Sequence, residues 1–125
     1  MRFLLDTYVL LWWLDDAPTL GEAARAAIAA PENLIAFSAA TLWEIRIKQA
    51  IGKLDLPEDF AELLARQAFE PLAVTIAHAH GLRDLPLLHR DPFDRMLVAQ
   101  ARIEGLTILT RDHAITQYDV PTLRA

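Results

Sequence analysis

Cysteine is absent from this sequence of 125 residues, and glycine occurs only four times. Without cysteine the chain can form no disulfide bond, no cysteine zinc site and no thiol nucleophile, and its four scattered histidines form no substitute ligand cluster. The glycines do not approach the spacing of a phosphate-binding glycine loop. These absences indicate a cytoplasmic protein and argue against disulfide-stabilised, zinc-finger and dinucleotide-binding classes.

Long apolar runs are missing as well. The chain begins with a short, mostly apolar segment, but Asp6 interrupts it and no small-residue cleavage site follows. No apolar run approaches the roughly 18 residues that a membrane-spanning helix needs. We therefore expect neither a signal peptide nor any insertion into a membrane.

Basic residues are in the minority, because 12 Lys and Arg face 17 Asp and Glu and the formal net charge is −5. Nonspecific binding of nucleic acid depends largely on neutralising phosphates with Lys and Arg, so a general nucleic-acid coat is not expected. No repeat or Gly/Ser linker divides the chain. At this length we expect one domain, residues 1–125.

Short apolar runs alternate with longer helical patterns, the order that favours a parallel sheet covered on both faces. Strands are predicted at residues 2–5, 34–37, 72–74 and 106–109, with a short edge strand near Val120. Helices are predicted at residues 7–14, 19–30 (with a capping box of Thr19 and Glu22), 38–51, 57–69, 75–81 and 91–104, followed by one turn from Arg111. The expected fold class is α/β, a three-layer α/β/α sandwich with a central parallel sheet of four or five strands.

Acidic residues fall where the predicted strands end. Asp6 directly follows the first strand, and Asp112 comes shortly after the fourth. Asp91 and Asp94 begin the helix that leads into the fourth strand, and Glu44 lies two turns into the helix after the second. Because the carboxyl ends of parallel strands meet at the edge where such folds bind ligands, these acids can share one crevice.

Carboxylates held within a few ångströms of each other repel, so at neutral pH they either bind a proton or hold a cation. A group of oxygen ligands without histidine or cysteine suits Mg²⁺ or Mn²⁺. Such an ion activates water and clamps the oxygens of a phosphodiester, so the pattern supports phosphodiester hydrolysis. Asp6 favours this interpretation, since an acid between an apolar strand and an apolar helix costs stability unless it is paired or coordinated.

Most of these acids also have a structural explanation. Asp91 precedes a proline and has the pattern of a helix N-cap, and Asp94 in the same first turn would favour the helix dipole. Asp112 can cap the turn that follows it. Glu44 is four residues from Lys48, the spacing of a helical ion pair. No single acid decides between the two interpretations.

Four motifs in order carry a resemblance to a known family. They are Leu4-Leu5-Asp6-Thr7, then Ser38 to Leu54, then Asp91 to Ala101, and last Leu109-Thr110-Arg111-Asp112. With these motifs the sequence resembles the PIN domain, and specifically the VapC ribonuclease toxins of bacterial toxin–antitoxin pairs, over essentially the whole chain. The resemblance implies cleavage of RNA that depends on Mg²⁺ or Mn²⁺, a homodimer, and a cognate antitoxin whose C-terminal segment blocks the active-site groove.

The same resemblance assigns roles to individual residues. It implies that the catalytic and metal-binding acids are Asp6, Glu44, Asp94 and Asp112. It places Asp91 at the rim of the site, and it gives the hydroxyls of Thr7 and Thr110 an auxiliary role in orienting water or carboxylates.

Substrate phosphates would need positive partners, and three basic residues lie within about a turn of the proposed ligands: Lys48, Arg95 and Arg111. Each of them can instead form an ordinary ion pair with a carboxylate, and for Lys48 this is the favoured interpretation. The tryptophans invite a base-stacking role, but adjacent Trp12 and Trp13 are more typical of a core or a dimer contact.

Two other functions stay open. An aspartyl-phosphate enzyme, similar to phosphohydrolases, is suggested by Leu5-Asp6-Thr7 after a strand, although Tyr8 stands where the dehalogenase pattern requires a second acid. A non-catalytic interaction domain with the PIN fold is the other, and it would be expected to have lost one or more of the four acids. All four are present.

The charge balance changes meaning if the five acids form one site. Without Asp6, Glu44, Asp91, Asp94 and Asp112, twelve acidic residues remain, the same number as Lys and Arg. The acidity of the chain would then be concentrated in a metal pocket, where a divalent ion neutralises much of it and attracts phosphate. The sequence therefore predicts that RNA binding depends on the metal.

Overall fold

The computed structural model describes all 125 residues and is built around a five-stranded parallel sheet. The strands are β1 (Arg2–Leu5), β2 (Leu34–Ser38), β3 (Glu70–Leu72), β4 (Thr107–Thr110) and β5 (Thr122–Arg124). Their order across the sheet is β3-β2-β1-β4-β5, and every neighbouring pair is parallel. The predicted parallel sheet is therefore confirmed, with five strands.

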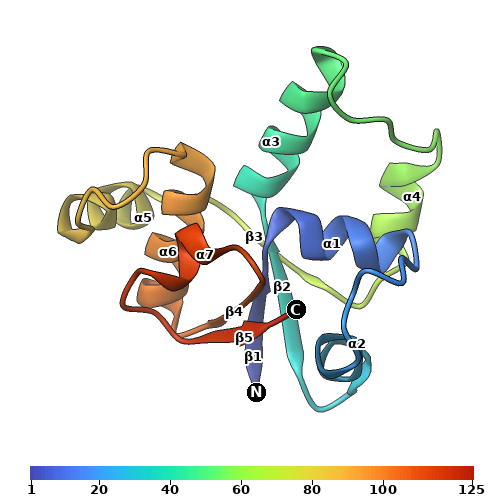
Figure 1. Ribbon diagram of the computed structural model, residues 1–125, viewed down its shortest axis with the longest axis horizontal. Helices are drawn as coiled ribbons and strands as arrows, with labels where there is room; N and C mark the ends of the chain where they lie inside the picture. Colours follow the sequence, from blue (N-terminus) through green and yellow to red (C-terminus); the bar gives the residue numbers. More distant parts are fainter.

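Helices cover both faces of this sheet (Figure 1). They are α1 (Thr7–Leu14), α2 (Glu22–Ala29), α3 (Ala39–Ala50), α4 (Phe60–Ala65), α5 (Ile76–Gly81), α6 (Pro92–Glu104) and α7 (His113–Thr116), with a 3₁₀ turn at Leu82–Asp84. One face carries α1, α2 and α4, and the other carries α5, α6 and α7, while α3 rises from the carboxyl edge (Figure 1). None of these helices combines the length and apolar character needed to cross a membrane.

The central strand explains why there are two cores. Along β1, Phe3 and Leu5 point to the α1 and α2 side, while Leu4 points to the α6 side, and each is at most 2% exposed. A strand buried on both faces reads as a continuous apolar run, which is how the sequence shows it. The two clusters contain 14 and 11 buried residues.

Several boundaries differ from the predictions. The capping box predicted for α2 is wrong, because Gly21 is the N-cap and no side chain caps this helix. Helix α4 begins at Phe60 and ends at Ala65, so it is shorter than the predicted 57–69. Strand β3 covers Glu70–Leu72 and includes Pro71, which lacks the N–H group that a central strand needs. At the outer position of the sheet this loss is tolerated.

Candidate active site

Asp6 lies at the carboxyl end of the central strand and is only 5% exposed. The hydroxyl of Thr110, the last residue of β4, donates a hydrogen bond of 2.7 Å to Asp6 Oδ2. The same hydroxyl accepts a hydrogen bond of 3.0 Å from the backbone N–H of Asp112. Thr110 therefore ties Asp6 to the loop that carries Asp112, while Asp112 itself caps α7 through Oδ1 and Ala114 N–H.

Glu44 enters the same region from α3 and is also buried. Thr7 donates a 2.7 Å hydrogen bond to its Oε1, and Lys48 donates one of 2.8 Å to its Oε2. Lys48 also donates to the hydroxyl of Tyr8 at 3.1 Å. Burial alone would lower the pKa of Lys48, but the hydrogen bonds to Glu44 and Tyr8 outweigh it and raise that pKa. The predicted ion pair between Glu44 and Lys48 is therefore confirmed.

The first turn of α6 supplies the remaining acids. Asp91 is its N-cap, and Oδ1 accepts hydrogen bonds from the N–H groups of Phe93 and Asp94 at 2.8 and 3.2 Å. Asp94 is buried, and its Oδ2 lies 3.0 Å from Nε2 of His89. Potential ligand atoms of His89, Asp91 and Asp94 all lie within 4.8 Å of one another. His89 was not among the predicted site residues, and its signal in the sequence is its position two residues before Asp91.

Electrostatic coupling shows that these acids form one group. Burial raises the pKa of Asp6 from 3.8 to about 6, and the negative charges of Asp112 and Glu44 add to the rise. Burial also raises the pKa of Asp94 from 3.8 to about 7, with further contributions from Asp91, Asp6 and Asp112. The structure thus brings all five predicted acids to one edge of the sheet.

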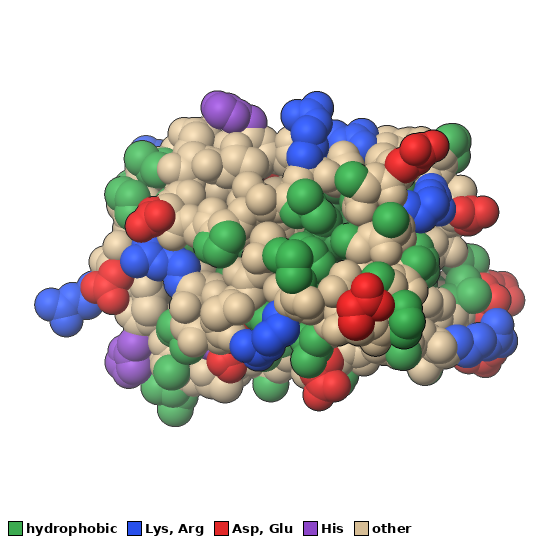
Figure 2. Space-filling model, turned by 90° about the horizontal axis from the view of Figure 1, so that it is seen from below, with side chains coloured by type: hydrophobic (Ala, Val, Ile, Leu, Met, Phe, Trp, Pro, Cys, Tyr) green, Lys and Arg blue, Asp and Glu red, His purple; other side chains and the backbone are tan.

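The chemistry of this donor set fits a divalent cation. Two acids resist ionisation, chiefly because they are buried away from water and also because neighbouring carboxylates repel them, and a cation held among them would favour their ionised forms. Carboxylate oxygens are the ligands preferred by Mg²⁺ and Mn²⁺, and an imidazole such as that of His89 is compatible with Mn²⁺. The opposite face differs, since Figure 2 shows acidic and basic side chains interspersed around a central group of hydrophobic ones.

Two arginines predicted to contact substrate phosphates have structural partners. Arg95 donates to the carbonyl of Pro86 at 3.0 Å and to the hydroxyl of Tyr118 at 3.2 Å. Arg111 donates to the carbonyls of Thr19 and Ala125, and its guanidinium lies 4.6 Å from the centre of the Trp12 ring. Both guanidinium groups hold loops and chain segments in place. A role on substrate phosphates stays a prediction that these contacts do not favour.

Comparison with known proteins identifies the family. Residues 3–121 match the family model of the PIN domain. The chain belongs to the PIN domain family. No curated protein sequence matches it significantly. The match covers β2, β3, β4, all but the first residue of β1, and all five acids of the site, and it confirms the resemblance to the PIN domain drawn from the four motifs.

Solved structures share the fold of this PIN domain. A chain of VapBC2 from Rickettsia felis, bound to a DNA fragment from its promoter, superposes with a TM-score of 0.76 at 16% identity, covering 99% of this chain and 98% of that chain. A chain of DNA-bound VapBC from Salmonella typhimurium superposes with a TM-score of 0.70 at 17% identity, covering 99% of this chain and 98% of that chain. A chain of FitAcB from Neisseria gonorrhoeae superposes with a TM-score of 0.66 at 22% identity, covering 97% of this chain and 96% of that chain. At these identities the likeness establishes the fold.

Proposed function

We propose that this PIN domain is a metal-dependent endoribonuclease and the toxin of a toxin–antitoxin pair, acting in the cytoplasm. The observation that carries the proposal is the meeting of Asp6, Glu44, Asp94 and Asp112 at one edge of the sheet, with the pKa values of Asp6 and Asp94 raised. Such a group is costly for a fold unless it binds a cation. No feature of the site favours an aspartyl-phosphate mechanism, and retention of all four acids argues against a non-catalytic domain.

Each residue of the site has a definite task in this proposal. Asp6, Glu44, Asp94 and Asp112 hold Mg²⁺ or Mn²⁺, which supplies water activation and neutralises charge on the phosphodiester. The hydroxyl of Thr110 fixes the orientation of Asp6. The hydroxyl of Thr7 and the ammonium of Lys48 fix the orientation of Glu44. Asp91 keeps the first turn of α6 in place at the rim of the site.

Hydrolysis of RNA by the purified protein tests the proposed nuclease activity. Cleavage of a mixed single-stranded RNA pool should require Mg²⁺ or Mn²⁺ and stop when EDTA is added. Loss of a residue that merely supports a metal ligand costs roughly 10–100-fold, so Asp6→Asn should lower the rate about 100-fold or more. The matched control is Asp119→Asn, which neutralises an exposed acid away from the site and should leave the rate unchanged. An intact RNA pool with either metal would refute the nuclease.

An antitoxin is the expected protein partner, and an apolar groove supports one. The groove has a volume of about 530 Å³ and lies between α1 and the segment leading into α4, with eight hydrophobic residues among the eleven that line it. Tyr8 belongs to its lining and also contacts Lys48, so the groove opens beside the acidic site. A partner segment can pack in the groove and reach the acids. Co-expression with the product of an adjoining short reading frame should give a stable complex that Leu56→Asp weakens.

A homodimer is supported by an apolar stripe on α3 and just beyond it. Trp43, Ile47 and Ile51 are spaced four residues apart, which places them on one side of the helix, and they are 65%, 38% and 60% exposed. Neighbouring exposed apolar side chains are typical of protein interfaces. We expect Ile47→Lys to convert a dimer to a monomer in size-exclusion chromatography with light scattering. Gln49→Lys, an exposed position on the opposite side of the helix, should remain dimeric, and a monomeric wild type would refute the dimer.

A further inference from the structure

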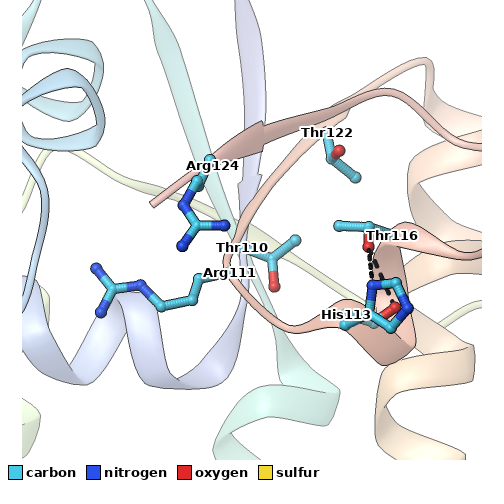
Figure 3. Close-up of a pocket in the computed structure, with 6 residues that line it drawn as sticks. All are labelled: Thr110, Arg111, His113, Thr116, Thr122 and Arg124. Atoms are coloured by element: carbon cyan, nitrogen blue, oxygen red, sulfur yellow. Dashed lines mark hydrogen bonds between the residues drawn. The ribbon is translucent and has the colours of Figure 1, made fainter.

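A second polar feature lies between β5, the end of β4 and α7 (Figure 3). It is a pocket of about 130 Å³ whose lining contains no hydrophobic residue and no carboxylate. The residues that line it are Thr110, Arg111, His113, Thr116, Thr122 and Arg124. A lining of arginine, histidine and hydroxyl groups provides hydrogen-bond donors and positive charge, which is the composition of an anion site.

The register of β4 and β5 builds this pocket. Thr122 pairs with Ile108 and Arg124 pairs with Thr110, and alternate residues of a strand share a face. Thr122 and Arg124 therefore lie on the face of the sheet that α7 covers. Helix α7 supplies His113 and Thr116, and Figure 3 shows these two on the side of the pocket opposite Arg124. The end of β4, helix α7 and strand β5 thus surround the pocket.

The positive charge of Arg124 is not used by the fold. Its guanidinium forms no hydrogen bond or ion pair with the rest of the chain, and neither does the hydroxyl of Thr122. The imidazole of His113 has only a 3.5 Å contact with the hydroxyl of Thr116, which donates to the carbonyl of His113 at 3.1 Å. Arg111 differs, because its guanidinium turns toward α1, away from His113 and Thr116, and binds backbone carbonyls (Figure 3). Arg124 is therefore the cation in the lining that can bind a ligand.

The size and place of the pocket point to one phosphate group. A space of about 130 Å³ accommodates a phosphate group, and the guanidinium, imidazole and hydroxyls that line it supply donors for phosphate oxygens. Thr110 lines the pocket and donates to Asp6, and Asp112 follows Arg111 directly in the chain. A phosphate in the pocket would therefore be a close neighbour of a phosphodiester held at the acids.

We propose that this pocket binds a backbone phosphate of the RNA strand next to the phosphodiester that is cleaved, with Arg124 as its principal ligand. The proposal rests on the nuclease function proposed above and names how that site holds its substrate. Arginine matches the geometry of phosphate oxygens with two donors. The pocket also explains how an acidic chain attracts RNA, because it offers an uncompensated positive charge beside the metal site.

Substitution of Arg124 by Gln tests the subsite. The side chain is exposed and makes no contact that the fold needs, so urea unfolding should be unchanged. With a short, dye-labelled single-stranded RNA that the wild type cleaves, we expect the KM to rise about ten-fold, the order expected for one lost charge-assisted contact. The kcat should stay within about two-fold, because the contact is present in both ground and transition states. The control is Arg102→Gln, which removes an exposed arginine near the opposite end of α6.

Two further readouts separate phosphate binding from a general charge effect. Affinity for the RNA should depend less on salt in Arg124→Gln, with the slope of log K against log salt smaller by about 0.7, the value for one phosphate on a single strand. Replacing the phosphates of the RNA one at a time by uncharged methylphosphonate should raise the KM of the wild type at one position where it has no effect on Arg124→Gln. Arg102→Gln should respond to that replacement like the wild type.

The outcomes distinguish the subsite from the nuclease. If the wild type cleaves RNA but Arg124→Gln has the same KM and salt slope, the subsite is refuted and the nuclease stands. The same holds if no methylphosphonate position is coupled to Arg124. If the wild type cleaves no RNA with Mg²⁺ or Mn²⁺, both proposals are refuted.

Discussion

Replacing Asp6 by Asn should stabilise the metal-free protein at neutral and alkaline pH, although it removes a central residue of the proposed active site. The pKa of Asp6 is raised from 3.8 to about 6 in the fold, chiefly by burial. Each pKa unit corresponds to about 1.4 kcal/mol, so ionised Asp6 opposes folding by about 3 kcal/mol. Asn removes the charge and keeps an oxygen that can accept the hydrogen bond of Thr110.

The pH window of this effect follows from the direction of the shift. Between pH 3.8 and about 6 the folded protein binds more protons at Asp6 than the unfolded chain does, so stability falls as the pH rises through this range. Above it the cost is constant. Asp6→Asn should therefore match the wild type near pH 4 and exceed its free energy of unfolding by about 3 kcal/mol near pH 8.

Urea denaturation in EDTA, followed by tryptophan fluorescence, measures the difference at both pH values, with Asp119→Asn as the control. Addition of Mg²⁺ or Mn²⁺ at about 100 times its dissociation constant should raise the stability of the wild type by roughly 2.7 kcal/mol and that of Asp6→Asn hardly at all. The metal therefore removes most of the variant's advantage. If the advantage of Asp6→Asn over the wild type is no larger at pH 8 than at pH 4, the argument that burial and neighbouring carboxylates oppose ionisation of Asp6 is wrong.

Two further predictions concern the neighbours of the acids. Lys48→Met leaves the buried Glu44 carboxylate without its cation and should lower the free energy of unfolding, measured in urea, by about 2 kcal/mol. Lys48→Arg keeps a cation and should lower it much less. Equal stability of the wild type and both variants would contradict this prediction. His89→Ala removes the hydrogen bond that lowers the pKa of Asp94, so that pKa should rise beyond about 7 in a carboxyl ¹³C NMR titration of the metal-free protein, and a fall would count against the assigned contact.

Local signals were enough to predict β1, β2 and β4 and the acids that follow these strands. Leu4 and Leu5 followed by Asp6 show the end of a buried strand without any knowledge of its neighbours. The N-cap of Asp91 and the ion pair of Glu44 with Lys48 also depend on residues within four positions. Such features are readable from the sequence because the interacting groups are close along the chain.

Long-range contacts account for what the sequence did not reveal. A proline such as Pro71 argues against a strand. The strand β3 forms because it pairs with β2 at the outer edge of the sheet, where the missing N–H group is tolerated. The partners of Arg111 are Thr19 and Ala125, of which Thr19 is 92 residues away in sequence. The pocket around Arg124 depends on the register of β5 against β4, which no pattern in either strand specifies.

The order of the strands gives Asp6 a position that no other acid of the site shares. Because β1 is central, with β2 on one side and β4 on the other, the chain builds the sheet first in one direction and then in the other. The connections that follow these strands diverge at the carboxyl end of β1, which is the topological switch point where open parallel sheets bind their ligands. Loops and helix ends can change around Asp6, while the place of Asp6 at this switch point is fixed by the order of the strands.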